Sequence, residues 1–334
     1  MIIRERIGKH LDQIKNLKGV ENVVLTQRDG NPIQSSGVWF SKDEIFSVSA
    51  ATSAIYNIGI HLHPKELKYI LIEGKKAKIL IAPLKNSYDT PLNKILEEQG
   101  IFENDNEFFI AITTLPTVNL GSIFLQTGDT LMKIKRTLIT SAESFKPPLI
   151  EFNSEQIKKM MENFDVKEDF SRNFKLSAYS LGFSEKDSYQ LDEILKTFSF
   201  TIPDLKCSFL TLEGGFIASK IIKKEKFWYN PIETIAAMSF SLFQTSNRCA
   251  WLLKKMQINT ILLDCETNFQ FIYGLNKGIF SSYIDKGKYK LGLLRLIIPQ
   301  YANKLNQVIK KALVIEDYKK SFDIKKLLGE LIIK

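Results

Sequence analysis

The chain contains little cysteine and no long apolar run. Its 334 residues include three cysteines, Cys207, Cys249 and Cys265, all in the second half and without CxxC spacing. Such a set predicts reduced, buried thiols of an intracellular protein. No segment approaches the roughly 18 apolar residues of a membrane span, and the first 17 residues hold no apolar core of the signal-peptide type. We therefore expect a soluble, cytoplasmic protein without a transmembrane segment.

The sequence also lacks the motifs of the common nucleotide-binding proteins and metalloenzymes. It has no P-loop, no GxGxxG, no HExxH and no Cys/His zinc spacing. His61 and His63 could suggest a metal pair, but no third ligand is nearby, and a structural site normally needs four. Asp29 and Glu213 would each need a partner base to act as general acids. We therefore expect no catalytic residue, no metal, no cofactor and no enzymatic activity.

Length and composition fit a globular protein of two or three domains of roughly 100–150 residues each. Hydrophobic residues make up 44% of the chain and charged residues 25%. The formal net charge of +9 is spread as lysines, which permits weak attraction to nucleic acid or anionic lipid without specifying either. The lysine groups at 75–78 and 220–226 are interpreted as solvated turns. The aromatic run at 227–229 fits either a core role or an exposed contact.

Two stretches far apart in the chain are alike, "KGVENVVLTQRDGNPIQSS" and "IPDLKCSFLTLEGGFIASK". Each has an apolar run, an acid-Gly pair and an Ile-x-Ser exit, which is typical of a tight hairpin turn because glycine accepts positive φ. The alignment equates Asp29-Gly30 with Glu213-Gly214, Ile33 with Ile217, and Ser35 with Ser219. A turn carboxylate is the simpler interpretation of both acidic residues.

The repeat continues in the same order after each hairpin. A helix follows, with Ser41 as N-cap in the first copy, and with Asn230 as cap and Pro231 at the first helical position in the second. Three strands come next, and a Leu-Gly pair with Gly121 or Gly292 opens a closing helix. A further helix precedes each copy. The order helix, strand, strand, helix, three strands, helix predicts an α+β fold with an antiparallel five-stranded sheet covered by helices.

The repeat divides the chain into four segments. We predict a first domain at 1–142, a linker at 143–185, a second domain at 186–313, and an amphipathic helix at 314–334. Within the linker we expect a short helix near 154–164. That last helix could cap the core, extend to a partner, or lie on a membrane surface.

This order, with "RDGNPIQSS" after the first strand and "NLG" before the closing helix, resembles the roadblock/dynein light chain family over residues 5–140 and 187–313. The resemblance implies dimers in which the helix after the hairpin packs against its counterpart and the third strands join two sheets. Because both copies lie on one chain, we expect an intramolecular pseudo-dimer, each half an α/β two-layer sandwich. The small residues of "SVSAATSA" and "IAAMSFS" would let the two helices approach closely.

The predicted interface residues lie on these two helices: Ile45, Val48, Ala51, Thr52, Ile55, Ile232, Ile235, Ala236, Ser239 and Phe243. The resemblance implies a non-enzymatic scaffold or regulator that binds a small Ras-like GTPase on the face around 43–58 and 231–246. Two alternatives stay open: a small-molecule-sensing or adaptor module, and electrostatic binding to nucleic acid or a membrane surface. We expect no sequence-specific nucleic acid binding, and further self-association is open.

Overall fold

The computed structural model describes residues 3–37, 41–64, 66–84, 108–140, 180–182, 184–213, 215–223, 230–252, 257–287, 290–311 and 313–315. The predicted linker helix at 154–164, the aromatic run at 227–229 and residues 316–334 of the predicted tail helix lie outside these ranges. The predicted domain boundaries stay a prediction, since most of the linker lies outside them as well.

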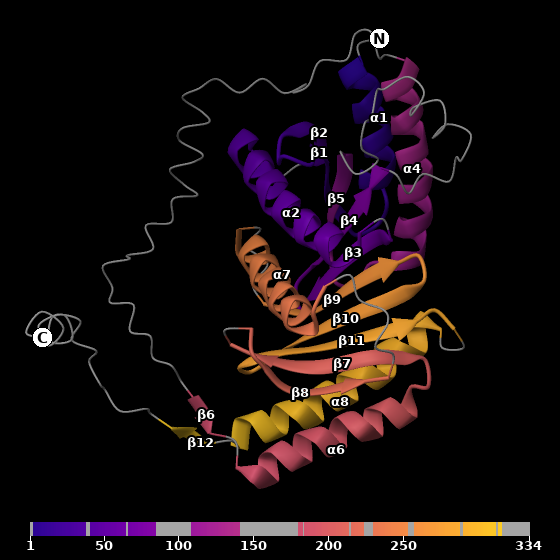
Figure 1. Cartoon of the computed structure of the whole chain (residues 1–334). Helices are drawn as coiled ribbons and strands as arrows, with labels where there is room; N and C mark the ends of the chain where they lie inside the picture. Colours follow the sequence, from indigo (N-terminus) through magenta and orange to yellow (C-terminus); the bar gives the residue numbers. More distant parts are fainter. Residues whose placement is uncertain are drawn as a thin grey trace, which may run out of the picture.

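Two modules follow each other with the same order of elements (Figure 1). The first consists of α1 (Ile3–Lys15), β1 (Val20–Gln27), β2 (Pro32–Gly37), α2 (Lys42–Leu62), β3 (Leu67–Gly74), β4 (Lys78–Pro83), β5 (Phe108–Thr114) and α4 (Leu120–Thr140). The second consists of α6 (Glu185–Thr201), β7 (Leu205–Leu212), β8 (Ile217–Ile222), α7 (Ile232–Leu252), β9 (Ile258–Cys265), β10 (Asn268–Leu275), β11 (Gly278–Asp285) and α8 (Leu291–Lys311).

A separate short ribbon joins β6 (Ser180–Gly182) to β12 (Leu313–Ile315). This ribbon adds a strand to the predicted linker and corrects the predicted start of the tail helix. The linker contains a strand just before the second module, and residues 314 and 315 belong to a strand and not to the start of a helix. Cross-strand hydrogen bonding therefore holds the two ends of the second module side by side.

The ten longer strands form one continuous antiparallel sheet in the order β2-β1-β5-β4-β3-β9-β10-β11-β7-β8. The third strands of the two modules, β3 and β9, join the halves, with Leu71 opposite Leu262 near the centre of their pairing. The expected pairing of the third strands is thus confirmed. Because the strand order of one half mirrors that of the other, a pseudo-twofold axis passes through this central pair.

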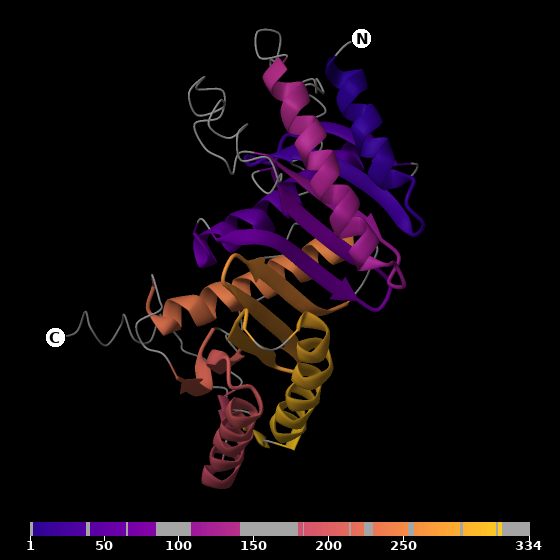
Figure 2. The ribbon, with the colours of Figure 1, turned by 90° about the vertical axis from the view of Figure 1, so that its right-hand side faces the viewer.

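Helices cover both faces of the sheet. One face carries α2 and α7, and the other carries α1, α4, α6 and α8 (Figures 1 and 2). The predicted α+β class is confirmed, but the two-layer description needs a third layer. The reason is visible in β5, where all seven residues are buried, so that the strand has no solvent-facing side.

The two long helices next to the module interface begin in different ways. The Ser41 side chain accepts from the Glu44 backbone N–H, and the Glu44 side chain accepts from the Ser41 backbone N–H, which together form a capping box. In the second module the Pro231 carbonyl accepts the first helical hydrogen bond, from the Ile235 N–H, at 3.1 Å. Pro231 therefore stands at the cap position predicted for Asn230, one residue later.

The two hairpins correspond, but one residue away from the sequence alignment. The strand pairs are Thr26–Pro32 and Leu25–Gln34 in the first module, and Thr211–Ile217 and Leu210–Ser219 in the second. Ile217 is therefore the counterpart of Pro32 and not of Ile33, and Ser219 is the counterpart of Gln34 and not of Ser35. Both hairpins have a β-bulge at the same place, which fixes this register.

The turn glycines show the same shift. Gly30 has φ +96° and Gly215 has φ +85°, so Gly215 takes the role predicted for Gly214, which lies outside the described residues. Alignment by residue type alone cannot distinguish the two adjacent glycines at 214 and 215. The backbone conformation selects the one that needs positive φ.

Helix α2 is the one described helix with the length and apolar composition to cross a membrane. Its Val48, Ile55, Tyr56 and Leu62 are buried within the folded chain. The same composition is thus used here by a core helix that packs against the sheet and, at its side, against α7 (Figure 1).

Candidate functional site: the interface of the two modules

Helices α2 and α7 pack against each other across the pseudo-twofold axis (Figure 1). Of the predicted interface residues, Ile55, Ile235, Ala236 and Phe243 lie in one buried cluster with the sheet, while Ala51 and Ile232 pack at its margin. Val48, Thr52 and Ser239 are also buried, and Ile45 is half-buried near the start of α2. The structure therefore brings most of the predicted set to one face.

Small residues set the distance between these helices and the sheet. A Cβ at Gly59 of α2 would stand 2.6 Å from Ile70 Cδ1 of β3, so a larger residue there would require the Ile70 side chain to move. The Thr52 hydroxyl donates to the Val48 carbonyl at 2.7 Å and is satisfied within its own helix. The helix thus approaches the strands without leaving this buried hydroxyl unpaired.

A buried polar network crosses the interface at the end of α2. The Gln270 side-chain carbonyl on β10 accepts from His63 Nε2 at 2.7 Å, and the Gln270 amide donates to Ser239 Oγ of α7 at 2.9 Å. The Tyr283 ring of β11 lies 5.6 Å from the His63 ring, centroid to centroid. One side chain of the first module is therefore hydrogen-bonded into the core of the second.

Burial determines the protonation of this network. Desolvation lowers the pKa of His63 to about 4, and Lys206 adds to the effect, against the opposing hydrogen bond with Gln270. Burial likewise raises the pKa of the Tyr283 hydroxyl well above its usual value. His63 is thus a neutral imidazole at physiological pH, and the network carries no charge of its own.

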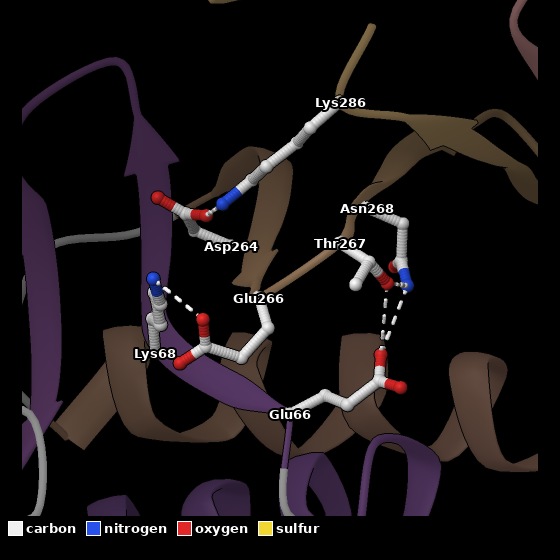
Figure 3. Close-up of polar contacts among 7 residues, drawn as sticks. All are labelled: Glu66, Lys68, Asp264, Glu266, Thr267, Asn268 and Lys286. Carbon is white, nitrogen blue, oxygen red and sulfur yellow. Dashed lines mark hydrogen bonds and ion pairs between the residues drawn. The ribbon is translucent and has the colours of Figure 1, made fainter.

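Polar contacts also join the modules at one end of the β3–β9 seam (Figure 3). Lys68 of β3 and Glu266, just after β9, form an ion pair at 2.8 Å. The Glu66 carboxylate accepts from the Asn268 amide at 3.1 Å and from the Thr267 hydroxyl at 3.4 Å. The Glu66 backbone carbonyl accepts from the Glu266 N–H at 2.8 Å. These contacts fix the register of the seam at that end.

Two further carboxylates near the seam have lysine or arginine partners. Glu73 of β3 pairs with Arg295 of α8 in the other module and lies 3.5 Å from Lys78. Asp264 of β9 pairs with Lys286 at 2.5 Å (Figure 3), and burial raises the pKa of this carboxyl. The Glu73–Arg295 pair is half-shielded from water and links the two modules, which distinguishes it from an ordinary surface ion pair.

The outer side of the helix pair is exposed. Along α7 an exposed stripe recurs at spacings of three and four residues: Ala237, Ser241, Gln244, Arg248 and Trp251. Trp251 leaves 60% of its surface in contact with solvent. On α2 the exposed positions of the corresponding side are Ala54 and His61. This face carries small residues at its centre and ends in one large aromatic side chain.

The remaining predicted residues have local roles. The Asp29 carboxylate accepts from the Asn31 backbone N–H at 2.9 Å and from its side-chain amide at 2.7 Å, so it closes the turn. Glu213 is exposed next to the second turn. Gly121 and Gly292 lie in the first turns of α4 and α8, and a Cβ at Gly292 would meet nothing within 4 Å. Packing does not require glycine at this second position.

The histidines and cysteines show no metal-site geometry in the described part of the chain. No group of three or more His, Cys, Asp or Glu residues is placed to hold an ion among these residues. His61 Nδ1 lies 2.7 Å from the Asn57 carbonyl, while His63 binds Gln270. All three cysteines are free and buried, and burial raises the pKa of Cys249 to about 12. Such thiols are unreactive at neutral pH.

The polar residues of the interface lie outside the set predicted from the sequence, apart from Thr52 and Ser239. Gln270 interrupts the apolar run "FQFIYG" of β10, and a polar residue inside such a run is the signal that a buried partner exists. His63 stands out in the sequence only as one half of a histidine pair. Trp251 gives no local signal at all, because a tryptophan near the end of an amphipathic helix is equally typical of a core residue.

Solved structures resemble the chain over about two fifths of its length. Myxococcus xanthus MglB shares 13% identity, with a TM-score of 0.36, over 39% of this chain and 96% of its own. The gliding protein MglB of Thermus thermophilus shares 15%, with a TM-score of 0.35, over 40% and 98%. A Roadblock/LC7 domain from Streptomyces avermitilis shares 9%, with a TM-score of 0.31, over 40% and 97%.

Comparison of the sequence with known families gives a match within the first module. A search of curated protein sequences finds no match. Residues 6–88, however, match the model of the Roadblock/LC7 domain family. Residues 6–88 of the first module are therefore similar to a Roadblock/LC7 domain, and the second module repeats the first module's order of helices and strands.

Proposed function

We propose that this chain is a cytoplasmic, non-enzymatic scaffold or regulator that binds a small Ras-like GTPase on the outer face of α2 and α7. The match of residues 6–88 to the Roadblock/LC7 family supports the proposal, because members of that family are associated with such switches and are typically not enzymes. The free, buried cysteines support a reducing compartment.

The observation that carries the proposal is the exposed stripe along α7. Trp251 and Arg248 are exposed one turn apart at one end of it, and tryptophan and arginine are the residue types that most often dominate binding energy at interfaces. Ser241 and Ala54 are small, exposed residues in the middle of α7 and α2, so that a partner element can lie close to the helix backbones there.

The two ends of this face differ. Gly30 lies against Ala50 of α2, and the equivalent turn residue Gly215 lies against Ala237 of α7. The two alanines are therefore equivalent, and each residue of α7 corresponds to the residue of α2 whose number is lower by 187. His61 is then the counterpart of Arg248, and the residue equivalent to Trp251 is a proline at 64. The strong anchor thus occurs once in the helix pair, which favours one GTPase bound in one orientation.

The test is a titration of the full chain with purified small Ras-like GTPases from the same organism, each loaded with GDP or with a non-hydrolysable GTP analogue. We expect binding in one nucleotide state at one partner per chain. Trp251→Ala and Ala54→Arg should each weaken it at least about tenfold, while Leu125→Ala, on the opposite face, should leave it unchanged. Absence of binding in both nucleotide states contradicts the proposal.

A further inference from the structure

The two halves of the module interface are related by the pseudo-twofold axis but carry different chemistry. One half contains the buried network of His63, Gln270, Ser239 and Tyr283. The strand register shows which residues occupy the symmetry-related places in the other half.

The counterpart of Gln270 is an isoleucine. Gln270 pairs with Leu263, which directly follows Leu262 at the axis, and Ile79 pairs with Ile72, which directly follows Leu71 at the axis. Ile79 therefore stands where Gln270 stands and is 2% exposed. The next strands also differ between the two halves. Tyr283 of β11 is opposite Gln270, whereas Thr113 of β5 is opposite Ile79.

The helices differ in the same way. Since Ala50 is equivalent to Ala237, Ser239 corresponds to Thr52, and His63 corresponds to Ala250. Ala250 is 1% exposed. The symmetry-related half thus contains alanine, isoleucine and threonine, and the Thr52 hydroxyl is bonded to its own helix. This half needs no polar partner from the other module.

We propose that the His63–Gln270–Ser239 network makes module pairing selective, so that each module pairs with the unlike module and not with a second copy of itself. The selectivity follows from what like pairs would bury. In a pair of two copies of the first module, each His63 would lie against Ile79 and would lack the Gln270 side chain to which it is bonded here. Two second modules would place Gln270 against Ala250 at both sites, without the imidazole. Buried polar groups that lose their partners disfavour such pairs, and the defect occurs twice in each.

Arg295 of α8 adds to the bias against pairs of first modules at the seam, because its partner Glu73 belongs to β3 of the other module. The Leu-Gly pairs that open the two closing helices make Phe124 of α4 the counterpart of Arg295. Phe124 packs edge-on against Tyr69 at 5.1 Å between ring centroids. A pair of first modules would therefore set Phe124, not a guanidinium, beside Glu73.

The test uses the full chain with a protease site inserted between residues 145 and 175, so that cleavage leaves both modules present in equal amounts. The cleaved protein is unfolded in urea, refolded, and its pairs are weighed by native mass spectrometry. Pairing without discrimination would give about half like pairs, whereas we expect like pairs to be suppressed at least roughly tenfold. Like pairs at the undiscriminated level would overturn the proposal.

A symmetrised variant assigns the effect to the network. His63→Ala with Gln270→Ile gives this half the alanine and isoleucine of the other half, and we expect the like pairs to return. Phe280→Leu, buried on the opposite face of the sheet, is the control: it should lower the melting temperature without producing like pairs. A symmetrised variant that still forms only unlike pairs also overturns the proposal.

The intact chain gives an independent readout. Gln270→Ile alone leaves His63 without its partner and should lower the melting temperature more than the double variant does. Additive effects of His63→Ala and Gln270→Ile would show that the two side chains are not coupled and would contradict the assignment.

Discussion

At the scale of single residues, His63 connects the modules through a neutral imidazole. Its pKa in the folded chain is about 4, while the ordinary value is 6.5. The unfolded chain therefore binds a proton first as the pH falls. The contribution of His63 to stability is fully present above pH 6.5 and is lost progressively between pH 6.5 and pH 4.

We expect the free energy of unfolding to fall by about 3 kcal/mol through this titration alone across that interval. Urea titrations at a series of pH values from 7 down to 4 measure it. His63→Gln, which keeps an amide donor toward Gln270 but does not titrate, should show a smaller pH dependence than the natural chain. Equal pH dependence in both proteins would contradict the buried, neutral imidazole.

The turn glycines give a matched pair of substitutions. Gly30→Ala forces a Cβ into a backbone with φ +96° and to within 3.2 Å of Ala50 Cα. We expect it to cost about 1–2 kcal/mol of stability from the backbone conformation alone. Gly292→Ala, where a Cβ meets nothing, should be neutral or slightly stabilising. Thermal unfolding compares the two; equal losses would contradict this account of the turn.

At the scale of the elements, the two sides of α2 have different roles. Residues on one side stabilise the fold, and residues on the other side are exposed to a partner. Ala51 packs at the margin of the buried cluster, whereas Ala54 is exposed. The hairpin turn at Gly30 lies against Ala50. Ala51 is the next residue, so its side chain is rotated by about 100° around the helix axis from that of Ala50.

Ala51→Arg should therefore destabilise the chain by about 1–3 kcal/mol, because the larger charged side chain must be accommodated at the helix pair. Ala54→Arg should change stability little. Melting temperatures measure both. An unchanged melting temperature in Ala51→Arg would contradict the helix pairing, whatever its effect on partner binding.

The sequence predicts the elements better than the contacts between them. The hydrophobic periodicity and the turn residues of the sequence are sufficient to predict the repeat, the N-cap at Ser41 and the α+β class. The hairpin register predicted from residue types is wrong by one residue, because two adjacent glycines are indistinguishable until the backbone shows which has positive φ. The partners of His63, Glu66 and Glu73 cannot be predicted, since each lies in the other module, about 200 residues away in sequence.

At the scale of the whole molecule, the central claim is that the two modules of one chain join through β3 and β9 into a single ten-stranded sheet. The seam is closed by an apolar centre at Leu71 and Leu262 and by polar contacts at its end (Figure 3). Since the halves are covalently linked, their local concentration is high, and intramolecular pairing is favoured over assembly of two chains.

The most direct measurement is zero-length carbodiimide cross-linking of the natural chain at low concentration, followed by peptide mass spectrometry of the monomer band. Lys68 and Glu266 lie 2.8 Å apart across the seam and are partly exposed, so we predict an amide link between them within one chain. The Lys220–Glu233 pair inside the second module, at 3.4 Å, is the control for reactivity. A Lys220–Glu233 link without the Lys68–Glu266 link, or a Lys68–Glu266 link found only between two chains, would contradict the intramolecular pairing.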